Sequence, residues 1–560
     1  MKVKILLISL CLALVLSSCS HGVERSISSV SSTADSNVVA SEDYQACNKQ
    51  LNRKIFEESS ISSVDPTNYD TRDDGEVWRV GSNRWNDQYE KMYSEWVKND
   101  TDTEFMNRYQ FPTDCADAGA IVRAVFSRIH HLPFMVSDGS RTIGNFTQRW
   151  SNYPTENGWS PDTWKTLLKT DLRFRMFIRE VSNIVHIPAI HYNTFPVRVM
   201  SEENPKQLSR YVRPGTILMN THHAELVKDL DRSQFDPLVK MNSTSPSKIR
   251  SLWIEPMDIE FPTTPNIGFI NWRWPVNCGR AGWRFVDVES MPGYSLEQVS
   301  LKDDNEFHSS SYHNFIQLLA HDGVLPHVQK KFVMEDVKNI VARIKRRAGI
   351  VEESVVFEQT HPNAFKNKNS QEYDDYSTPA FDTSDRARYL RELSMLDSQT
   401  DQVEVTRDDF NSLLAKEWVD IGNGRKVNAF YYSMALIEDG DVSSEPSASL
   451  PERWGHRWVQ NHLSILKSDL EKAQSELSQA EASYQNFVKA HPAPPLKRSD
   501  YLKTAILVGI ENALNLPIML YLPKVRAGNS APENAVNIAR SKVLWQQKQI
   551  QDIKLNYGIE

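Results

Sequence analysis

A cysteine at the start of an amphipathic segment is the residue in this sequence best suited to covalent chemistry. The segment 111–134 reads FPTDCADAGAIVRAVFSRIHHLPF, and apolar side chains after Cys115 recur at helical spacing. Thr113 or Asp114 can cap a helix that begins near the cysteine. At the first helical position, the helix dipole and unpaired amides lower the pKa of a thiol, although the charge of Asp114 opposes this effect. The pattern predicts a nucleophile at Cys115, with helix-terminal amides that can bind an oxyanion.

A cysteine nucleophile needs an imidazole to remove its proton, and a third group to orient that imidazole. Residues 213–231, RPGTILMNTHHAELVKDLD, predict a strand with two adjacent histidines. Strand alternation places His223 with Glu225 on one face, and His222 with Ala224 on the other. Because only one face can meet the helix, only one of the two histidines can serve the thiol.

The order of these motifs resembles the papain-like superfamily. A cysteine opens a helix in DCADAGAIVRAVF, a strand follows at HHAELV, and a further strand ends in WIEP at 253–256. The transglutaminase-like and bacterial cell-wall cysteine peptidase branches are the most similar. The resemblance implies an α+β domain in which a central helix packs on an antiparallel sheet. Carried over to this sequence, it makes Cys115 the nucleophile, His223 the base and Glu255 the orienting group.

Other residues compete for two of these three roles. His222 is the rival base, and three nearby aspartates rival Glu255, namely Asp229, Asp231 and Asp258. The spacing between cysteine and histidine is longer than is usual in the family. The resemblance therefore implies an insertion at residues 135–210, whose role is to line or cover the site.

The first residues predict export and a lipid anchor. Lys2 and Lys4 precede the apolar run ILLISLCLALVL, which is too short for a membrane span. The run leads into LSSC at 16–19, which resembles the lipobox of bacterial lipoproteins and implies a lipid on Cys19. An ordinary signal peptide cut nearby is the alternative. Ser20 after the cysteine implies the outer membrane, facing the periplasm, rather than the inner membrane. Residues 20–45 are rich in serine and predict a flexible tether.

Cysteine usage supports a free thiol at Cys115. The sequence has five cysteines, of which Cys11 leaves with the signal and Cys19 carries the lipid. Three cysteines in an oxidising compartment suggest one disulfide and one free thiol. Cys47 and Cys278 are the expected pair because they lie in polar or turn-like stretches. The alternative is that all three are reduced and inert.

Composition narrows the classes of ligand. A net charge of −8 over 560 residues argues against binding to nucleic acid. We expect no cofactor and no metal. Four histidines lie close together in the sequence, but no two of them have the i,i+4 spacing of a helical metal site. They are His308, His313, His321 and His327. The fourteen tryptophans are expected in the core, with stacking on sugars as the alternative.

Three regions follow the tether. Residues 46–300 mix helical and strand-like runs and form the expected papain-like domain, while residues 301–450 are mostly helical with a long polar loop near 360–379. Residues 451–560 carry two heptad stripes, the first from Val459 to Phe487 and the second from Val536 to Ile553 with Gln546 as a polar exception. An antiparallel hairpin within one chain is preferred to a dimeric coiled coil. The apolar segment 504–522 contains Glu511 and is expected to pack on the body rather than span a bilayer.

The predicted function is that of a lipid-anchored cysteine hydrolase of the cell envelope. It would cleave an amide bond through a thioester, in a peptidoglycan peptide or an envelope protein. The first alternative is a non-catalytic envelope lipoprotein that uses the same fold and docks a partner at its C-terminal hairpin. The second is a transglutaminase, in which an amine accepts the acyl group in place of water.

Overall fold

The computed structural model describes Cys47 and residues 75–80, 83–221, 223–234, 236–257, 259–301, 309–324, 330–398, 405–438, 442–490 and 531–557. The predicted signal with Cys19, the tether 20–45, His222, Asp258 and the apolar segment 504–522 lie outside these residues. Two compact units divide the chain: the first comprises Met1–Glu58 with Val276–Arg284, and the second Ser59–Pro275 with Phe285–Glu560.

The first unit contains the only disulfide that the described residues form. Cys47 and Cys278 are joined, with 5.5 Å between their Cα atoms. Cys278 lies in a tight turn between the short strands β9 (Pro275–Asn277) and β10 (Trp283–Phe285), which pair with each other. The pairing expected from the cysteine count is therefore present in the structure.

A six-stranded antiparallel sheet forms the centre of the second unit. Its strand order is β3-β8-β4-β5-β6-β7, and every neighbouring pair is antiparallel. The strands are β3 (Thr194–Pro196), β4 (Ile217–Asn220), β5 (His223–Leu230), β6 (Leu238–Asn242), β7 (Trp253–Pro256) and β8 (Gly268–Trp272). The expected class, an α+β fold with an antiparallel sheet, is confirmed.

Helix α5 (Cys115–Ile129) packs on the middle of this sheet, against β5. All of its residues from 116 to 129 are buried, so it is a core helix on every side. Arg123 is accommodated there because Glu90 of α3 (Asp87–Asp100) accepts a hydrogen bond from it, with 2.9 Å between Nη1 and Oε2. Ten of the fourteen tryptophans are buried, as expected of core residues.

The expected insertion at 135–210 covers α5 and adds an edge strand to the sheet. Its helix α7 (Leu172–Ile184) packs against α5. Its other elements are β1 (Met135–Ser137), β2 (Thr142–Gly144), α6 (Trp164–Thr170), η2 (Ile187–Ala189), α8 (Ile190–Asn193) and β3. A short helix α4 (Phe105–Tyr109) precedes α5.

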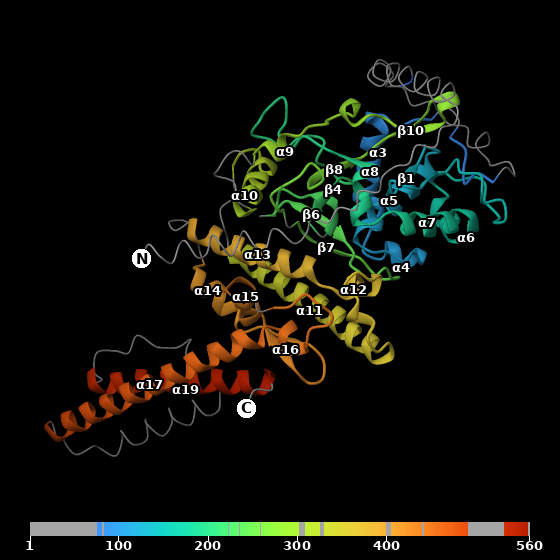
Figure 1. Cartoon of the computed structure of the whole chain (residues 1–560). Helices are drawn as coiled ribbons and strands as arrows, with labels where there is room; N and C mark the ends of the chain where they lie inside the picture. Colours follow the sequence, from blue (N-terminus) through green and yellow to red (C-terminus); the bar gives the residue numbers. More distant parts are fainter. Residues whose placement is uncertain are drawn as a thin grey trace, which may run out of the picture. The chain divides into compact units, whose positions relative to one another are not determined.

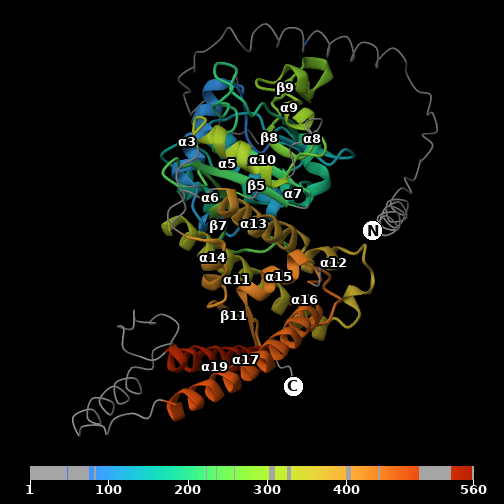
Figure 2. The same ribbon diagram turned by 90° about the vertical axis from the view of Figure 1, so that its left-hand side faces the viewer.

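The helical region lies against the sheet rather than apart from it. Arg343 of α11 (Lys330–Thr360) donates a hydrogen bond to Glu255 of β7, and Arg388 of α13 (Pro379–Ser398) donates to the Pro256 carbonyl at 2.9 Å. Figures 1 and 2 show α11 and α13 next to the strands. The sheet domain and the helical region are therefore parts of one compact unit.

The helical region has its own core and is not wholly helical. Helix α9 (Glu297–Ser300) precedes this region. The elements of the region are α10 (Ser309–Ala320), α11, α13, α14 (Arg407–Leu414), α15 (Ala429–Glu438), the start of α16 (Leu450–Arg453) and a small hairpin of β11 (Trp418–Asp420) with β12 (Lys426–Asn428). The residues GNGR at 422–425 form the turn that joins the two strands, and Gly422, Asn423 and Gly424 all have positive φ. Apolar residues of α11, α13, α14 and α15 bury one another there.

The polar stretch 360–379 contains structure where the sequence predicted a long loop. It holds the turn η6 (Ala364–Lys366) and helix α12 (Gln371–Tyr376). Phe365, Tyr373 and Tyr376 form a small core of their own. The stretch is polar overall, so its composition does not indicate these three aromatic side chains as core residues. Their burial stabilises η6 and α12.

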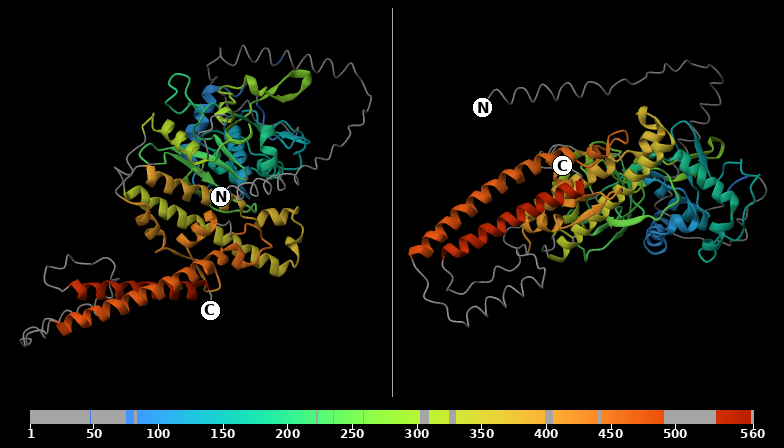
Figure 3. Two further views of the ribbon diagram at one scale, coloured as in Figure 1. Left: turned by 60° about the vertical axis from the view of Figure 1, so that its left-hand side comes forward. Right: turned by 90° about the horizontal axis from the view of Figure 1, so that it is seen from below.

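The C-terminal helices form the expected antiparallel pair. Helices α17 (His456–Ala490) and α19 (Ala531–Tyr557) run side by side in Figures 1 and 3. Arg540 pairs with Glu481 at 3.0 Å and Lys542 with Glu476 at 2.8 Å, which fixes the antiparallel direction. The most buried seam residues are Val459, Leu463, Leu466, Ala473, Val536, Ala539, Val543 and Ile553. None of the described helices combines the length and the apolar character that a membrane span needs.

Candidate active site

Asp114 caps the helix that presents the cysteine. Its Oδ1 accepts hydrogen bonds from the backbone of Ala116 at 2.9 Å and of Asp117 at 3.1 Å. In return, the Asp117 carboxylate accepts a hydrogen bond from the Asp114 backbone at 2.7 Å, which completes a capping box. Cys115 is therefore the first residue of α5, as the sequence predicted. The amides of Ala116 and Asp117, however, are occupied by the cap and are not donors for an oxyanion.

The Cys115 thiol is half-buried and is the free cysteine of the described residues. Burial raises the pKa of the thiol, and the charges of Asp114 and Asp117 raise it further. The backbone N–H groups of Ala224 and of Cys115 itself donate to the sulfur and act in the opposite direction. The expectation of a lowered pKa is wrong, because loss of water and two neighbouring carboxyl groups outweigh the helix terminus.

The face of β5 that meets α5 is the one opposite His223. A Cβ atom on Gly119 of α5 would lie 3.2 Å from Ile217 Cδ1. Ile217 is paired with Leu226, and paired residues of antiparallel strands project to the same face. Leu226 and Ala224 therefore face α5, and His223 projects to the other side of the sheet. The structure does not bring His223 to Cys115.

His223 is instead a neutral residue of the buried core. It is 7% exposed. Burial, together with the charges of Lys240 and Arg343, lowers the pKa of His223 to about 3. A hydrogen bond with the Asn242 side chain acts to raise it. An imidazole on the side of the sheet opposite α5, with a pKa this low, is too far away and too weak a base to take a proton from Cys115.

Glu255 lies on the same face as His223 and is held by cations of another element. Arg343 donates to Oε1 at 2.7 Å, Arg346 donates to Oε2, and Lys240 Nζ lies 3.3 Å from Oε1. Burial acts to raise the pKa of Glu255, but these positive charges outweigh it and hold that pKa at about 2. The expected triad is therefore not assembled: His223 and Glu255 are together, and Cys115 is apart from both.

The rival residues do not replace the missing partners within the described part of the chain. His222 and Asp258 lie outside it. Asp229 forms an ion pair with Lys98 at 2.6 Å, and Asp231 accepts hydrogen bonds from Ser233. Both aspartates lie at the far end of β5 from Ala224, and so away from the thiol.

A histidine to which no sequence motif pointed lies within electrostatic reach of the start of α5. The exposed His186 follows α7 and lies near enough to Asp114 to lower the pKa of that carboxyl, which burial raises overall. His186 Nδ1 lies 2.9 Å from the Ile184 carbonyl, so Nδ1 carries the proton and Nε2 is the acceptor. No sequence signal points to His186, since its proximity depends on how the insertion packs.

No metal was expected from the sequence, and only two of its four neighbouring histidines, His313 and His321, belong to the described residues. His308 and His327 lie outside the described residues, and His313 contacts Asp236. A different group has carboxylate oxygens within 4.8 Å of one another, and consists of Asp236, Asp336 and Glu392. Arg391 lies 3.3 Å from Asp236 and 3.2 Å from Glu392, so an arginine already neutralises part of this charge.

No family model matches this chain, and neither the curated proteins nor the solved structures compared with it include a match.

Proposed function

We propose that this chain is a lipid-anchored protein of the bacterial cell envelope, on the outer membrane facing the periplasm, that cleaves an amide bond through a thioester on Cys115. The observation that carries the proposal is the free, half-buried thiol at the first position of α5. The amides of Cys115 and Ala224 lie at its sulfur, and these are the donors available to an oxyanion. A peptidoglycan peptide or an envelope protein is the proposed substrate.

The reaction has two halves. The sulfur attacks the amide carbonyl, a base takes the S–H proton, and the same proton passes to the departing amine. Water then attacks the thioester, which releases a carboxylic acid and restores the thiol. An amine in place of water would give a transglutaminase. Because the pKa of the thiol is raised, the base must act during the attack rather than maintain a permanent thiolate.

Two histidines are candidates for this base. His186 lies within electrostatic reach of Asp114, the residue that precedes the nucleophile, and its Nε2 is the acceptor nitrogen. His222 is the residue that strand alternation in the sequence assigns to the Ala224 side, and it stays a sequence prediction. His223 is not a candidate for the base, because it projects to the side of the sheet opposite α5.

The test uses the chain from residue 20 onward, in which Cys115 is the one thiol outside the Cys47–Cys278 disulfide. Peptidoglycan peptides and unfolded envelope proteins should be cleaved, and mass spectrometry after acid quenching should find an acyl group on Cys115. Cys115→Ala should abolish both signals. Replacing the true base, His186 or His222, by alanine should slow cleavage by about 100-fold or more. Cleavage that survives Cys115→Ala would overturn the proposal.

A non-catalytic role is the second candidate, favoured by the raised pKa of the Cys115 thiol. In that case the hairpin would dock a partner through its exposed apolar side chains, which are Ile465, Ile538, Leu544, Trp545 and Leu555. This function predicts no acyl group on Cys115 with any substrate, and labelling of the thiol by iodoacetamide only after denaturant is added.

A further inference from the structure

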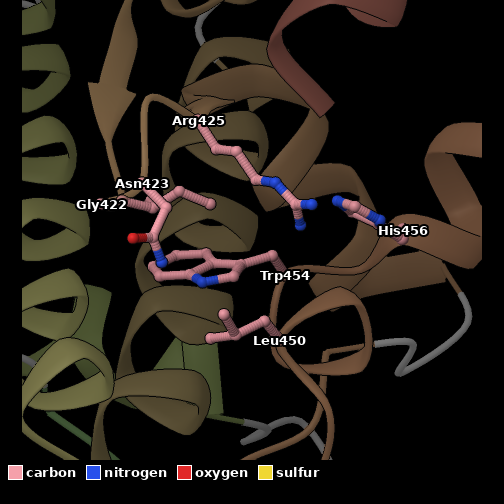
Figure 4. A pocket seen from close by; sticks show the side chains of 7 residues that line it. Gly422, Asn423, Arg425, Leu450, Trp454 and His456 are labelled. Carbon is pink, nitrogen blue, oxygen red and sulfur yellow. The ribbon is translucent and has the colours of Figure 1, made fainter. Parts of the chain in front are cut away.

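A cavity of about 610 Å³ lies beside the edge strand β7, where the turn between β5 and β6 meets the start of α11. Five of its described lining residues carry a carboxyl group, namely Asp231, Asp236, Glu255, Glu335 and Asp336. Lys331 is the one among them with a positive charge, and its Nζ lies 4.7 Å from the centroid of the Phe332 ring. The smaller cavity in Figure 4 has Arg425 and His456 in its lining but no carboxyl group among the lining residues that the structure describes. The acidic lining is therefore a property of the cavity beside β7, and it favours a cation.

Four of these five carboxyl groups already have a hydrogen-bond donor. The pairs are Asp231 with Ser233, Asp236 with Gln317, Glu255 with Arg343 and Glu335 with Lys338. The network around Glu255 is also balanced in charge, because three cations face three carboxylates there. They are Lys240, Arg343 and Arg346, with Glu225, Glu255 and Asp385. Asp336 is the exception among the five.

Asp336 has no such donor within the part of the chain that the structure describes. It is 5% exposed and lines the cavity, and its oxygens retain accessible surface. The group that it reaches is Glu392 of α13, which is another carboxyl. Asp236, Asp336 and Glu392 form an acidic triplet, in which one oxygen of each lies within 4.8 Å of the others. Two carboxyl groups in contact need a proton or a cation between them, so Asp336 is a buried carboxyl that still lacks a cationic partner.

Among the described residues, the positive charges around the acidic triplet are one fewer than its carboxyl groups. Arg388 and Arg391 of α13 are the guanidinium groups that act on all three members. His313 adds no charge: the Gln317 amide nitrogen, which donates to the triplet, lies 2.9 Å from His313 Nε2, so that ring nitrogen accepts a hydrogen bond. Burial raises the pKa of Asp336, and the charges of the other two members raise it further. The triplet therefore lacks one positive charge, at the member that lines the cavity.

The lining favours an organic cation with one charge at the triplet over a metal ion. Arg391 lies 3.3 Å from Asp236 and 3.2 Å from Glu392, so it already occupies oxygens that a metal ion would have to share. The cavity is also far larger than a metal ion, and its size suits a small organic ligand. Ile254, which is 43% exposed, and Phe332 add apolar surface to the lining. An ammonium group has a single positive charge and three N–H donors, which is what the triplet lacks.

We propose that this cavity binds a primary ammonium group on a short alkyl stem, with the ammonium at Asp336 and the stem against Ile254 and Phe332. The ammonium donates to the Asp336 carboxylate and supplies the missing positive charge, while the stem covers apolar surface that is otherwise exposed. A free diamine and the lysine side chain of a peptide both carry this group, and the two sources can be distinguished by experiment.

The test is calorimetric titration of the full-length chain in detergent, at constant ionic strength, with cadaverine and with Nα-acetyl-lysine methylamide as separate probes. We expect saturable binding of at least one probe at one site per chain, with a Kd of about 1 mM or tighter. Tighter binding of cadaverine would assign a free diamine, and tighter binding of the lysine derivative a peptide side chain. Pentan-1-ol, which has the stem without the charge, should not bind. Failure of both amines to bind would overturn the proposal, and so would calcium chloride that binds at Asp336 more tightly than either amine.

Three variants locate the site. Asp336→Asn should weaken amine binding by about tenfold or more, because it removes the charge but keeps the shape of the side chain, and its amide can donate to Glu392. Phe332→Ala leaves every charge in place and should weaken binding severalfold, through loss of contact with the stem. Glu358→Gln is the matched control: it removes an exposed carboxylate of α11 outside the lining, and binding should stay within twofold of wild type. Binding that is unchanged in either of the first two variants would overturn the proposal, so Phe332→Ala remains a test even if Asp336→Asn fails to fold.

Discussion

Arg343 of α11 and Glu255 of β7 form a buried ion pair, with 2.7 Å between Nη1 and Oε1. Arg343 also donates to Asp385 of α13, and Lys240 joins Glu255 to Glu225. This network connects the sheet to the helical region. The residue that the papain-like resemblance assigned to catalysis therefore has a structural role.

Removal of Glu255 should destabilise the fold strongly. Glu255→Ala removes a buried carboxylate that Arg343, Arg346 and Lys240 share. Asp385 and Glu225 remain for Arg343 and Lys240, but one buried positive charge loses its counter-charge. Breaking a buried pair in this way typically lowers the free energy of unfolding by about 3–5 kcal/mol. Urea denaturation followed by circular dichroism measures this loss. The control is Glu353→Ala, which breaks an exposed pair with Lys248 and should lower stability by about 1 kcal/mol or less. Equal effects of the two substitutions would contradict the buried network.

His223 should make stability depend on pH below neutrality. Its pKa is about 3 in the folded chain, against about 6.5 when unfolded. Between these values the unfolded chain binds a proton that the folded chain does not, so stability falls as pH falls from about 6.5 toward 3. His223→Gln should reduce the slope of unfolding free energy against pH by up to about 1.4 kcal/mol per unit between pH 4 and 6. Burial lowers the pKa of His130 and of His131 to about 4, so these two maintain part of the slope. An unchanged slope in His223→Gln would show that this imidazole is not held neutral.

The charge of Asp114 should restrain the reactivity of Cys115. Asn caps a helix about as well as Asp, so Asp114→Asn keeps the start of α5 while it removes a charge that raises the pKa of the thiol. We expect alkylation by iodoacetamide at pH 8 to become severalfold faster. Asp162→Asn, an exposed position on another segment, is the control and should leave the rate unchanged. Identical rates in Asp114→Asn and wild type would mean that this carboxylate does not act on the sulfur.

A polar residue in the helical hairpin should limit its stability. Gln546 is 4% exposed, and its Oε1 has no hydrogen-bond partner among the described residues. Gln546→Leu removes the unsatisfied amide and extends the apolar seam, so we expect the free energy of unfolding to rise by about 1 kcal/mol. Thermal melting compares this variant with Gln547→Leu, an exposed neighbour expected to stay within about 0.5 kcal/mol of wild type. A loss of stability in Gln546→Leu would point to a partner for the glutamine.

Some elements could not be predicted from the sequence because they contain polar residues at positions that are usually apolar. Strand β6 has the sequence LVKMN, in which Lys240 and Asn242 interrupt the apolar run, so no strand was predicted there. Lys240 is fully buried and is tolerated because Glu225 of β5 lies 2.6 Å away and Glu255 of β7 lies 3.3 Å away. Helix α12 was not predicted for a related reason: its acidic residues indicated an exposed loop, although Tyr373 and Tyr376 are buried.

The sequence alone determined the features that depend on near neighbours in the chain. A capping pattern places Cys115 after the Asp114 cap at the start of α5. Glycines mark the turn at 422–425, and heptad patterns indicate the antiparallel C-terminal pair. All three patterns act within a few residues. The tertiary structure decided which side of β5 meets α5. Alternation distinguishes the two faces, but the first six residues of β5 are all buried, so hydrophobicity cannot tell which face the helix covers. Two of the three cations that hold Glu255, Arg343 and Arg346, come from α11, about ninety residues away in sequence, and only packing brings them to it.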